Sequence, residues 1–149
     1  MKLRLAFALA APLMFAALPA AADDAVLFSC TTAKGQAVEI RGDSGKSEDG
    51  QQQLSYRVGT RTFSSEAVYS RCTGKNGNSR QTLDAEHQGT AYRLLVEDQL
   101  KRPNARATLR IQTHGAKSGK GVRTLVCRPD TIHHADALSG LGSVSSPCK

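Results

Sequence analysis

The sequence predicts an all-β protein: one small antiparallel barrel or sandwich with two disulfides. Three observations lead to this fold class. Apolar residues recur with a period of two through most of the chain, which is typical of half-buried strands. Short segments rich in Gly, Asn and Pro separate these runs. Four cysteines occur in a chain that begins like an exported protein, and such chains commonly carry disulfides.

The first 22 residues have the layout of a secretory signal peptide. Met1-Lys2-Leu3-Arg4 gives a positive start, an apolar stretch runs from 5 to 18, and Ala20-Ala21-Ala22 offers small residues for cleavage. No cysteine lies at the cleavage point, and no later stretch reaches the 18 apolar residues typical of a membrane span. We therefore expect a soluble periplasmic protein without a lipid anchor, with residues 23–149 forming a single domain.

The strands are expected where apolar and polar residues alternate. In chain order these segments are 26–30, 38–40, 54–58, 63–72, 92–96, 106–112 and 122–128. The apolar positions that define them include Val26 and Phe28, Val38 and Ile40, Leu54 and Tyr56, Phe63 and Val68, Tyr92 and Leu94, Leu109 and Ile111, and Val122 with Cys127. Strands that follow one another without a ten-residue helical pattern between them favour antiparallel pairing.

Turn-forming residues separate these runs. The expected turns are 42–45, 74–78, 101–104 and 114–121, each with Gly, Asn, Asp or Pro at close spacing. After Pro129, residues 132–141 are expected to form one short helix or an ordered tail. The remaining chain is long enough for one core but not for two domains.

The cysteines predict two structural disulfides, formed among Cys30, Cys72, Cys127 and Cys148. Three pairings are compatible with the sequence. Because the spacings contain no C-x-x-C, neither a zinc knuckle nor a thioredoxin-type redox pair is expected.

Neither a metal site nor a cofactor is expected. His133 and His134 lie near Asp130 and Asp136, but adjacent side chains diverge on a strand or a helix, so the pair is interpreted as solvated. His87 and His114 lie close to glycines in expected turns and are also interpreted as surface residues. Residues 115–121 and 44–47 look superficially like phosphate loops but lack the glycine spacing or the strand-to-helix context that such a loop needs.

Catalysis is not the favoured function. The chain has no G-x-S-x-G or H-E-x-x-H motif. If their segment is a strand, Asp84 and Glu86 would lie on one face of it about 7 Å apart, a spacing at which two carboxylates can hydrolyse a glycosidic bond. A small envelope hydrolase that uses this pair is therefore kept as an alternative, although the absence of Trp leaves little aromatic surface for a sugar.

Positive charge is the more informative feature. The formal net charge is +7, and it becomes +5 when Lys2 and Arg4 leave with the signal peptide. Arg57, Arg93, Arg106, Arg110 and Arg123 are expected to project outward from strands with an apolar opposite face. Guanidinium groups bind carboxylates and phosphates in a bidentate manner.

These residues predict a non-enzymatic periplasmic binding protein with an anionic envelope component or a protein as its partner. Nucleic acid is not expected as a partner, because few aromatic residues are available for stacking. The contact residues are expected to be Arg106, Arg110, Arg123, Lys117, Ser118 and Lys120. The alternative is a structural or stress-related envelope protein without a specific partner, whose charge serves solubility alone.

Near the start of the predicted domain, residues 27–40 read LFSCTTAKGQAVEI and residues 54–59 read LSYRVG. These strings resemble the F-x-C-x-T-x-x-G-K opening and the Y-x-x-G strand of a group of small exported proteobacterial proteins of uncharacterised function. The resemblance implies an exported class rather than an activity. Arg41 stands where the group has its second cysteine, so the resemblance implies a more distant partner for Cys30.

Residues 118–122 read SGKGV. This string is loosely similar to the S-G-x-x-Y inhibitory loop of the periplasmic inhibitors of c-type lysozyme, with Val122 in place of the tyrosine. Those inhibitors are small disulfide-closed antiparallel barrels. This similarity implies the architecture and an inhibitor or immunity type of role, while the basic charge disfavours a basic lysozyme as target.

Overall fold

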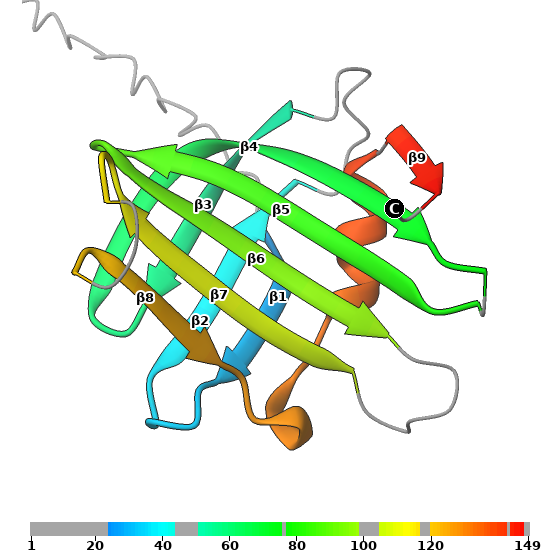
Figure 1. Ribbon diagram of the computed structural model, residues 1–149, viewed down its shortest axis with the longest axis horizontal. Helices are drawn as coiled ribbons and strands as arrows, with labels where there is room; N and C mark the ends of the chain where they lie inside the picture. The colour runs from blue at the N-terminus through cyan, green and yellow to red at the C-terminus, as the bar shows by residue number, and fades with distance from the viewer. Residues whose placement is uncertain are drawn as a thin grey trace, which may run out of the picture.

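Eight consecutive strands form one coiled antiparallel sheet in which every strand pairs with its neighbours in the chain (Figure 1). They are β1 (Ala25–Thr31), β2 (Ala37–Gly42), β3 (Gln51–Val58), β4 (Arg61–Thr73), β5 (Ser79–His87), β6 (Thr90–Asp98), β7 (Arg106–Thr113) and β8 (Val122–Val126). The sheet is a half-barrel, which confirms the all-β class and excludes two separately packed sheets.

The computed structural model describes residues 24–43, 51–75, 77–98, 105–116, 120–142 and 144–147, the last of these as backbone only. The expected signal peptide therefore lies outside the described residues. So do Lys117, Ser118 and Cys148. No helix within the described ranges is long and apolar enough to cross a membrane.

The segments after β8 return to β1 and β4. Two short 3₁₀ helices follow, η1 (Pro129–Thr131) and η2 (Ala135–Leu141), and η2 packs against β1. The last strand, β9 (Val144–Pro147), pairs in parallel with the end of β4, beyond the stretch of β4 that pairs with β3. The short helix expected within 132–141 is thus present as η2.

Side-chain alternation separates the inner face of the sheet from the outer face. In β7 the inward Ala107 and Leu109 are 1% and 2% exposed, whereas Arg106 and Arg110 are exposed on the outer face. Leu27 and Phe28 of β1 are both fully buried, because the register with β2 shifts between Val26 and Phe28. The core therefore fills the concave side of the half-barrel.

The two edge strands of the sheet, β1 and β8, meet at one end. A disulfide joins Cys30 of β1 to Cys127, the residue after β8, with 5.8 Å between the Cα atoms. Beside it the amide of Ala33 donates to the carbonyl of Val126 at 2.9 Å, and the amide of Arg128 donates to the carbonyl of Thr31 at 2.9 Å. One of the two expected disulfides is thus confirmed, and its pairing is Cys30–Cys127.

Two strands, β5 and the short β9, were not expected from the sequence. β5 has the inward residues Gln81, Leu83, Ala85 and His87, and of these Leu83 alone is a large aliphatic residue. Gln81 is nevertheless 7% exposed and accepts a hydrogen bond from the hydroxyl of Tyr69 at 2.7 Å. A polar side chain at this inner position is therefore paired within the core.

Candidate binding surface

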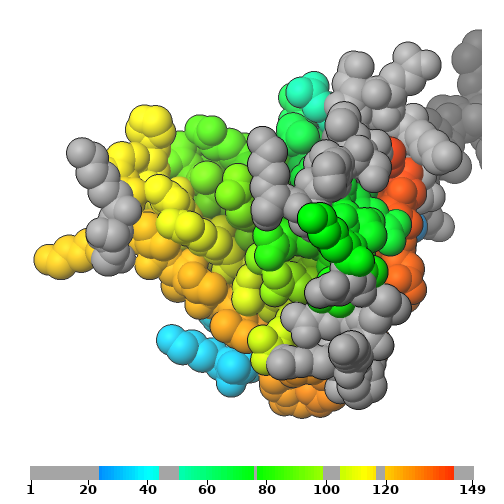
Figure 2. Space-filling view, turned by 45° about the vertical axis from the view of Figure 1, so that its right-hand side comes forward, coloured from blue at the N-terminus to red at the C-terminus, as the bar shows by residue number. Residues whose placement is uncertain are grey.

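The outer face of β6 and β7 carries three of the five arginines that the sequence singled out, Arg93, Arg106 and Arg110, whereas Arg57 lies on β3. Figure 2 shows part of this flank, from the yellow-green of β6 through the yellow of β7 to the orange of β8. Register places Arg93 of β6 opposite Arg110 of β7, and Glu97 of β6 opposite Arg106. Arg106 and Arg110 lie on the same face of β7 with Thr108 between them, separated by about 13 Å along the strand.

Some arginines of the outer face are neutralised by carboxylates of neighbouring strands. Nε of Arg93 donates to Oδ1 of Asp84 at 2.6 Å and its Nη2 donates to Oδ2 at 3.2 Å, and this two-point contact raises the pKa of the Arg93 guanidinium. Nη2 of Arg80 donates to Oε1 of Glu97 at 2.9 Å. These exposed pairs contribute little to stability, about 0–1 kcal/mol each, but they cancel local charge.

Arg106 and Arg110 differ from these paired arginines. Although Glu97 is the cross-strand neighbour of Arg106, its carboxylate bonds to Arg80 on the other side. Arg110 faces Arg93 on β6 and Thr124 on β8, neither of which carries a negative charge. Among the described residues, neither guanidinium has a carboxylate partner. The outer face of β7 therefore presents two uncompensated positive charges.

Charge is also segregated along the chain in this region. Between Asp98 and Asp130 there is no acidic residue, while this stretch contains eight basic ones: Lys101, Arg102, Arg106, Arg110, Lys117, Lys120, Arg123 and Arg128. β7 and β8 both belong to this stretch. This stretch without acidic residues, rather than the total net charge, is the sequence feature that indicates a basic surface on β7 and β8.

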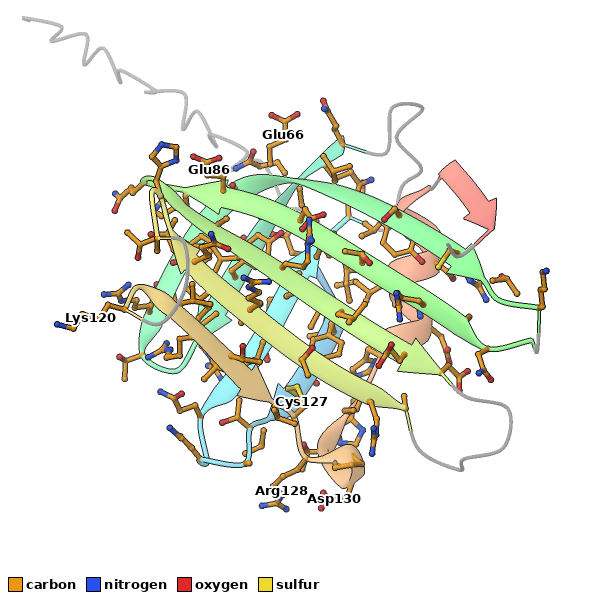
Figure 3. The ribbon with its side chains drawn as sticks, viewed as in Figure 1. Glu66, Glu86, Lys120, Cys127, Arg128 and Asp130 are labelled. Atoms are coloured by element: carbon orange, nitrogen blue, oxygen red, sulfur yellow. A yellow bond between two sulfur atoms is a disulfide. The ribbon has the colours of Figure 1, made fainter. Side chains whose placement is uncertain are left out.

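Arg123 differs from the expectation that it would share the outer face. It lies opposite Ile111 of β7, and Leu125 lies opposite Leu109, so Arg123 belongs to the inner-face register. It is exposed because it lies near the end of the barrel, next to the β7–β8 turn. Lys120 is exposed in the same turn (Figure 3).

A groove of about 420 Å³ lies along the outer face where β6 and β7 meet the end of β8. Its lining combines charged and apolar residues, namely Leu95, Glu97, Arg106, Ala107, Thr108, Val126, Cys127 and Pro129. Val126 is 52% exposed, a large value for an aliphatic residue of a strand. The groove thus places an apolar contact beside Arg106.

The carboxylates of the hydrolase alternative lie where the spacing predicted. Asp84 and Glu86 both point outward from β5, and they line a second outer groove of about 570 Å³ together with Glu66 of β4 (Figure 3). The carboxylate of Asp84 accepts both hydrogen bonds from Arg93. This ion pair occupies the oxygens that a catalytic pair would need to present to a substrate.

The histidines do not form a site with each other. His133 and His134 are exposed, with ring centroids 6.4 Å apart, and His133 instead pairs through its backbone with Ser29. His87 is partly buried and stacks on Phe63 at 4.8 Å, which the sequence did not indicate. In the described part of the chain, no group of three His, Cys, Asp or Glu side chains is placed to hold a metal ion.

Comparisons with known proteins found no matching family model, no matching curated protein and no matching solved structure. The class of protein is therefore defined by the fold and by this surface: an all-β half-barrel, closed by a disulfide at one end, with a basic outer face on β7.

Proposed function

We propose that this chain is a non-enzymatic, exported binding protein that engages an anionic partner through the outer face of β6–β8. One observation carries the proposal: Arg106 and Arg110 lack carboxylate partners among the described residues, whereas Arg80 and Arg93 on the same sheet are neutralised. These two charges also lie on one strand within a stretch of the chain that has no acidic residue between Asp98 and Asp130.

The partner is a protein or an envelope component that carries carboxylates or phosphates, for which guanidinium groups are well suited. Two arginines about 13 Å apart can contact two separate anionic groups. Because both side chains are exposed, their attraction should be screened at ionic strengths where the Debye length is about 8 Å or less. Inhibition of an enzyme or an immunity role is one form that such binding can take.

The periplasm is the proposed location. The leader expected from the sequence of residues 1–22 and the Cys30–Cys127 disulfide both agree with an oxidising compartment. We further propose that Cys72 pairs with Cys148. Cys72 lies opposite Ser146 in the β4–β9 pairing, and Cys148 follows two residues later. Mass spectrometry of the unreduced, digested protein should find this peptide pair, and a free thiol at Cys148 would exclude it.

The test compares two double variants with the same change in net charge. Arg106→Gln/Arg110→Gln removes the uncompensated pair, and Arg41→Gln/Arg57→Gln removes two exposed arginines of β2 and β3 while Glu97 keeps its bond to Arg80. The probes are vesicles containing phosphatidylglycerol and, separately, envelope extract captured on the immobilised protein at low and high salt. If each contacting arginine contributes about 1 kcal/mol, the first variant should bind vesicles about 30-fold more weakly.

Each outcome decides between functions. A much larger loss in the β7 variant, with thermal stability retained in both, supports the proposal. Equal losses would mean that net charge alone is responsible, and an absence of any saturable partner would favour a structural or stress-related role. An activity that disappears in Asp84→Asn or Glu86→Gln variants with unchanged stability would instead favour the hydrolase.

A further inference from the structure

The two edges of the sheet are covered to different extents. At the β1 edge the segment after β8 supplies partners: the amide of Ser29 donates to the carbonyl of His133 at 3.1 Å, and the amide of His133 donates back at 2.9 Å. The hydroxyl of Thr131 accepts from the amide of Thr31 at 2.9 Å. β8, in contrast, pairs with β7 on one side, and no described strand lies along its other side from 122 to 125.

The alternation of hydrogen-bonded residues along β8 shows which of its backbone groups face the open edge. The amide of Cys127 donates to the carbonyl of Ala107, and the amide of Thr113 donates to the carbonyl of Gly121, both at 2.9 Å. In an antiparallel ladder such bonded positions alternate along the strand. The odd-numbered residues of β8 therefore bond to β7, and Val122 and Thr124 direct their N–H and C=O groups away from it.

Val126, the next even-numbered residue of β8, follows the same alternation. The carbonyl of Val126 points away from β7 and accepts from the amide of Ala33 in the β1–β2 turn. The chain thus uses this edge once, at the end where the disulfide joins β8 to β1. Beyond that point the backbone groups of Val122 and Thr124 have no partner among the described residues.

The chemistry beside this edge is basic and partly apolar. Lys120 precedes β8 and Arg128 follows it, and Figure 3 labels both near the two ends of the strand. Arg123 lies between them, on the inner-face side, and no acidic residue interrupts this part of the sequence. On the outer side, Val126 exposes about half of its surface. Self-pairing of two such edges would bring like charges together.

We propose that an extended acidic segment of a partner protein adds to the open edge of β8 as a further antiparallel strand. This inference rests on the proposed function, because it specifies how the anionic partner is held. Backbone hydrogen bonds to Val122 and Thr124 give the segment its alignment, and side chains select it, as in other strand-addition interfaces. A carboxylate would lie beside Arg123, and an apolar side chain beside Val126.

The alternation of the strand predicts the partner's pattern. Residues of the segment that lie opposite Val122 and Thr124 should be β-branched and face outward, and the one opposite Thr124 lies diagonally from Val126, whose own edge position is taken by Ala33. Residues opposite Arg123 and near Lys120 should be acidic and face the inner side. The probe peptide acetyl-Ala-Thr-Glu-Val-Asp-amide follows this pattern and stops before Val126, and the same peptide with Lys at both acidic positions is its control.

Backbone amide spectra and hydrogen exchange of ¹⁵N-labelled protein, purified from the periplasm of an expression host, provide the first measurement. Without the peptide, the Val122 and Thr124 amides should exchange at least about 10-fold faster than those of Arg123 and Leu125, which are bonded to β7. With the acidic peptide, the first two should shift saturably and become protected. The Lys peptide should produce neither effect.

A backbone variant separates strand addition from simple charge attraction. Thr124→Pro removes an N–H that is not used by β7, and edge strands tolerate proline at such positions. It should weaken peptide binding by about 10-fold or more while the melting temperature stays nearly unchanged, because edge hydrogen bonds are lost. Thr124→Val retains the N–H and should bind within about 2-fold of the wild type. If the proline variant does not fold, the exchange data on the wild type decide.

The outcomes distinguish this inference from the proposed function. Loss of peptide binding in Thr124→Pro with vesicle binding retained supports strand addition. Shifts confined to Arg106 and Arg110, or no saturable binding of the peptide, would overturn strand addition and leave the basic face to be judged by its own variants. A doubled mass in sedimentation without peptide would also overturn it, because a second copy would then occupy the edge.

Discussion

Replacing Tyr69 with Phe should destabilise the fold by about 2 kcal/mol. The Tyr69 hydroxyl donates to Oε1 of Gln81 at 2.7 Å, and the two residues are 2% and 7% exposed. The substitution removes this donor and leaves the amide oxygen of Gln81 buried without its partner. Leaving a buried acceptor unsatisfied costs about 1–3 kcal/mol, which is more than the net contribution of an average hydrogen bond.

Tyr56 provides the matched control in the same core. Its ring is 4% exposed and stacks on Phe63 at a centroid distance of 4.9 Å, but its hydroxyl is buried without a hydrogen-bond partner among the described residues. Tyr56→Phe keeps the stacked ring and removes a polar atom whose desolvation is not compensated. We expect a change between zero and about 1 kcal/mol of stabilisation.

Urea unfolding followed by far-UV circular dichroism measures both variants, since the chain has no Trp to serve as a fluorescence probe. The slopes against urea should match that of the wild type, so that differences in midpoint report stability alone. Equal destabilisation by the two substitutions would refute the reasoning, because it would mean that the loss of a hydroxyl matters regardless of its partner. A double variant, Tyr69→Phe with Gln81→Leu, should recover part of the loss.

Three further predictions concern the core and the disulfide that joins β1 to the end of β8. Burial raises the pKa of Tyr56, so the unfolded state loses the phenolic proton at a lower pH than the folded state does. The free energy of unfolding should therefore fall above about pH 10, by up to ~1.4 kcal/mol per pH unit. Tyr56→Phe should make the decline of the urea midpoint with pH shallower. Cys30→Ala/Cys127→Ala opens a link between residues 97 apart and should cost roughly 4–5 kcal/mol in the chain-entropy model, lowering the melting temperature by about 15–20 °C; a loss below ~1 kcal/mol would contradict that account. Gly42→Ala places a methyl group against the Leu54 side chain and should cost about 1–3 kcal/mol in the same urea assay, whereas an unchanged midpoint would show that Leu54 moves aside freely.

The period-two pattern predicted most of the sheet because the strands it found bury one face and expose the other. In β7, Ala107 and Leu109 alternate with Arg106 and Arg110, and this contrast is visible in the sequence alone. The pattern did not predict β5, because the inner face of this strand contains small or polar residues such as Ala85 and Gln81. Their suitability for the core depends on partners from other strands, which a pattern within one segment does not show.

The candidate surface was only partly predictable for a related reason. Sequence identified Arg106 and Arg110 as outward residues, but strand register decides which arginines meet a carboxylate. Glu97 could have neutralised Arg106 opposite it and instead bonds to Arg80. The placement of Arg123 on the inner-face register also depends on pairing, since it follows from its position opposite Ile111.

The position of the disulfide bears on both stability and binding. A meander of strands always has two edges, and unprotected edges invite unwanted pairing. This chain covers the β1 edge with its own later segments and ties the end of β8 to β1 through Cys127. The tie holds β8 in register while leaving Val122 and Thr124 open. Basic residues along that edge repel a second copy of the chain and attract an acidic strand. The same charges can therefore prevent self-association and select the partner.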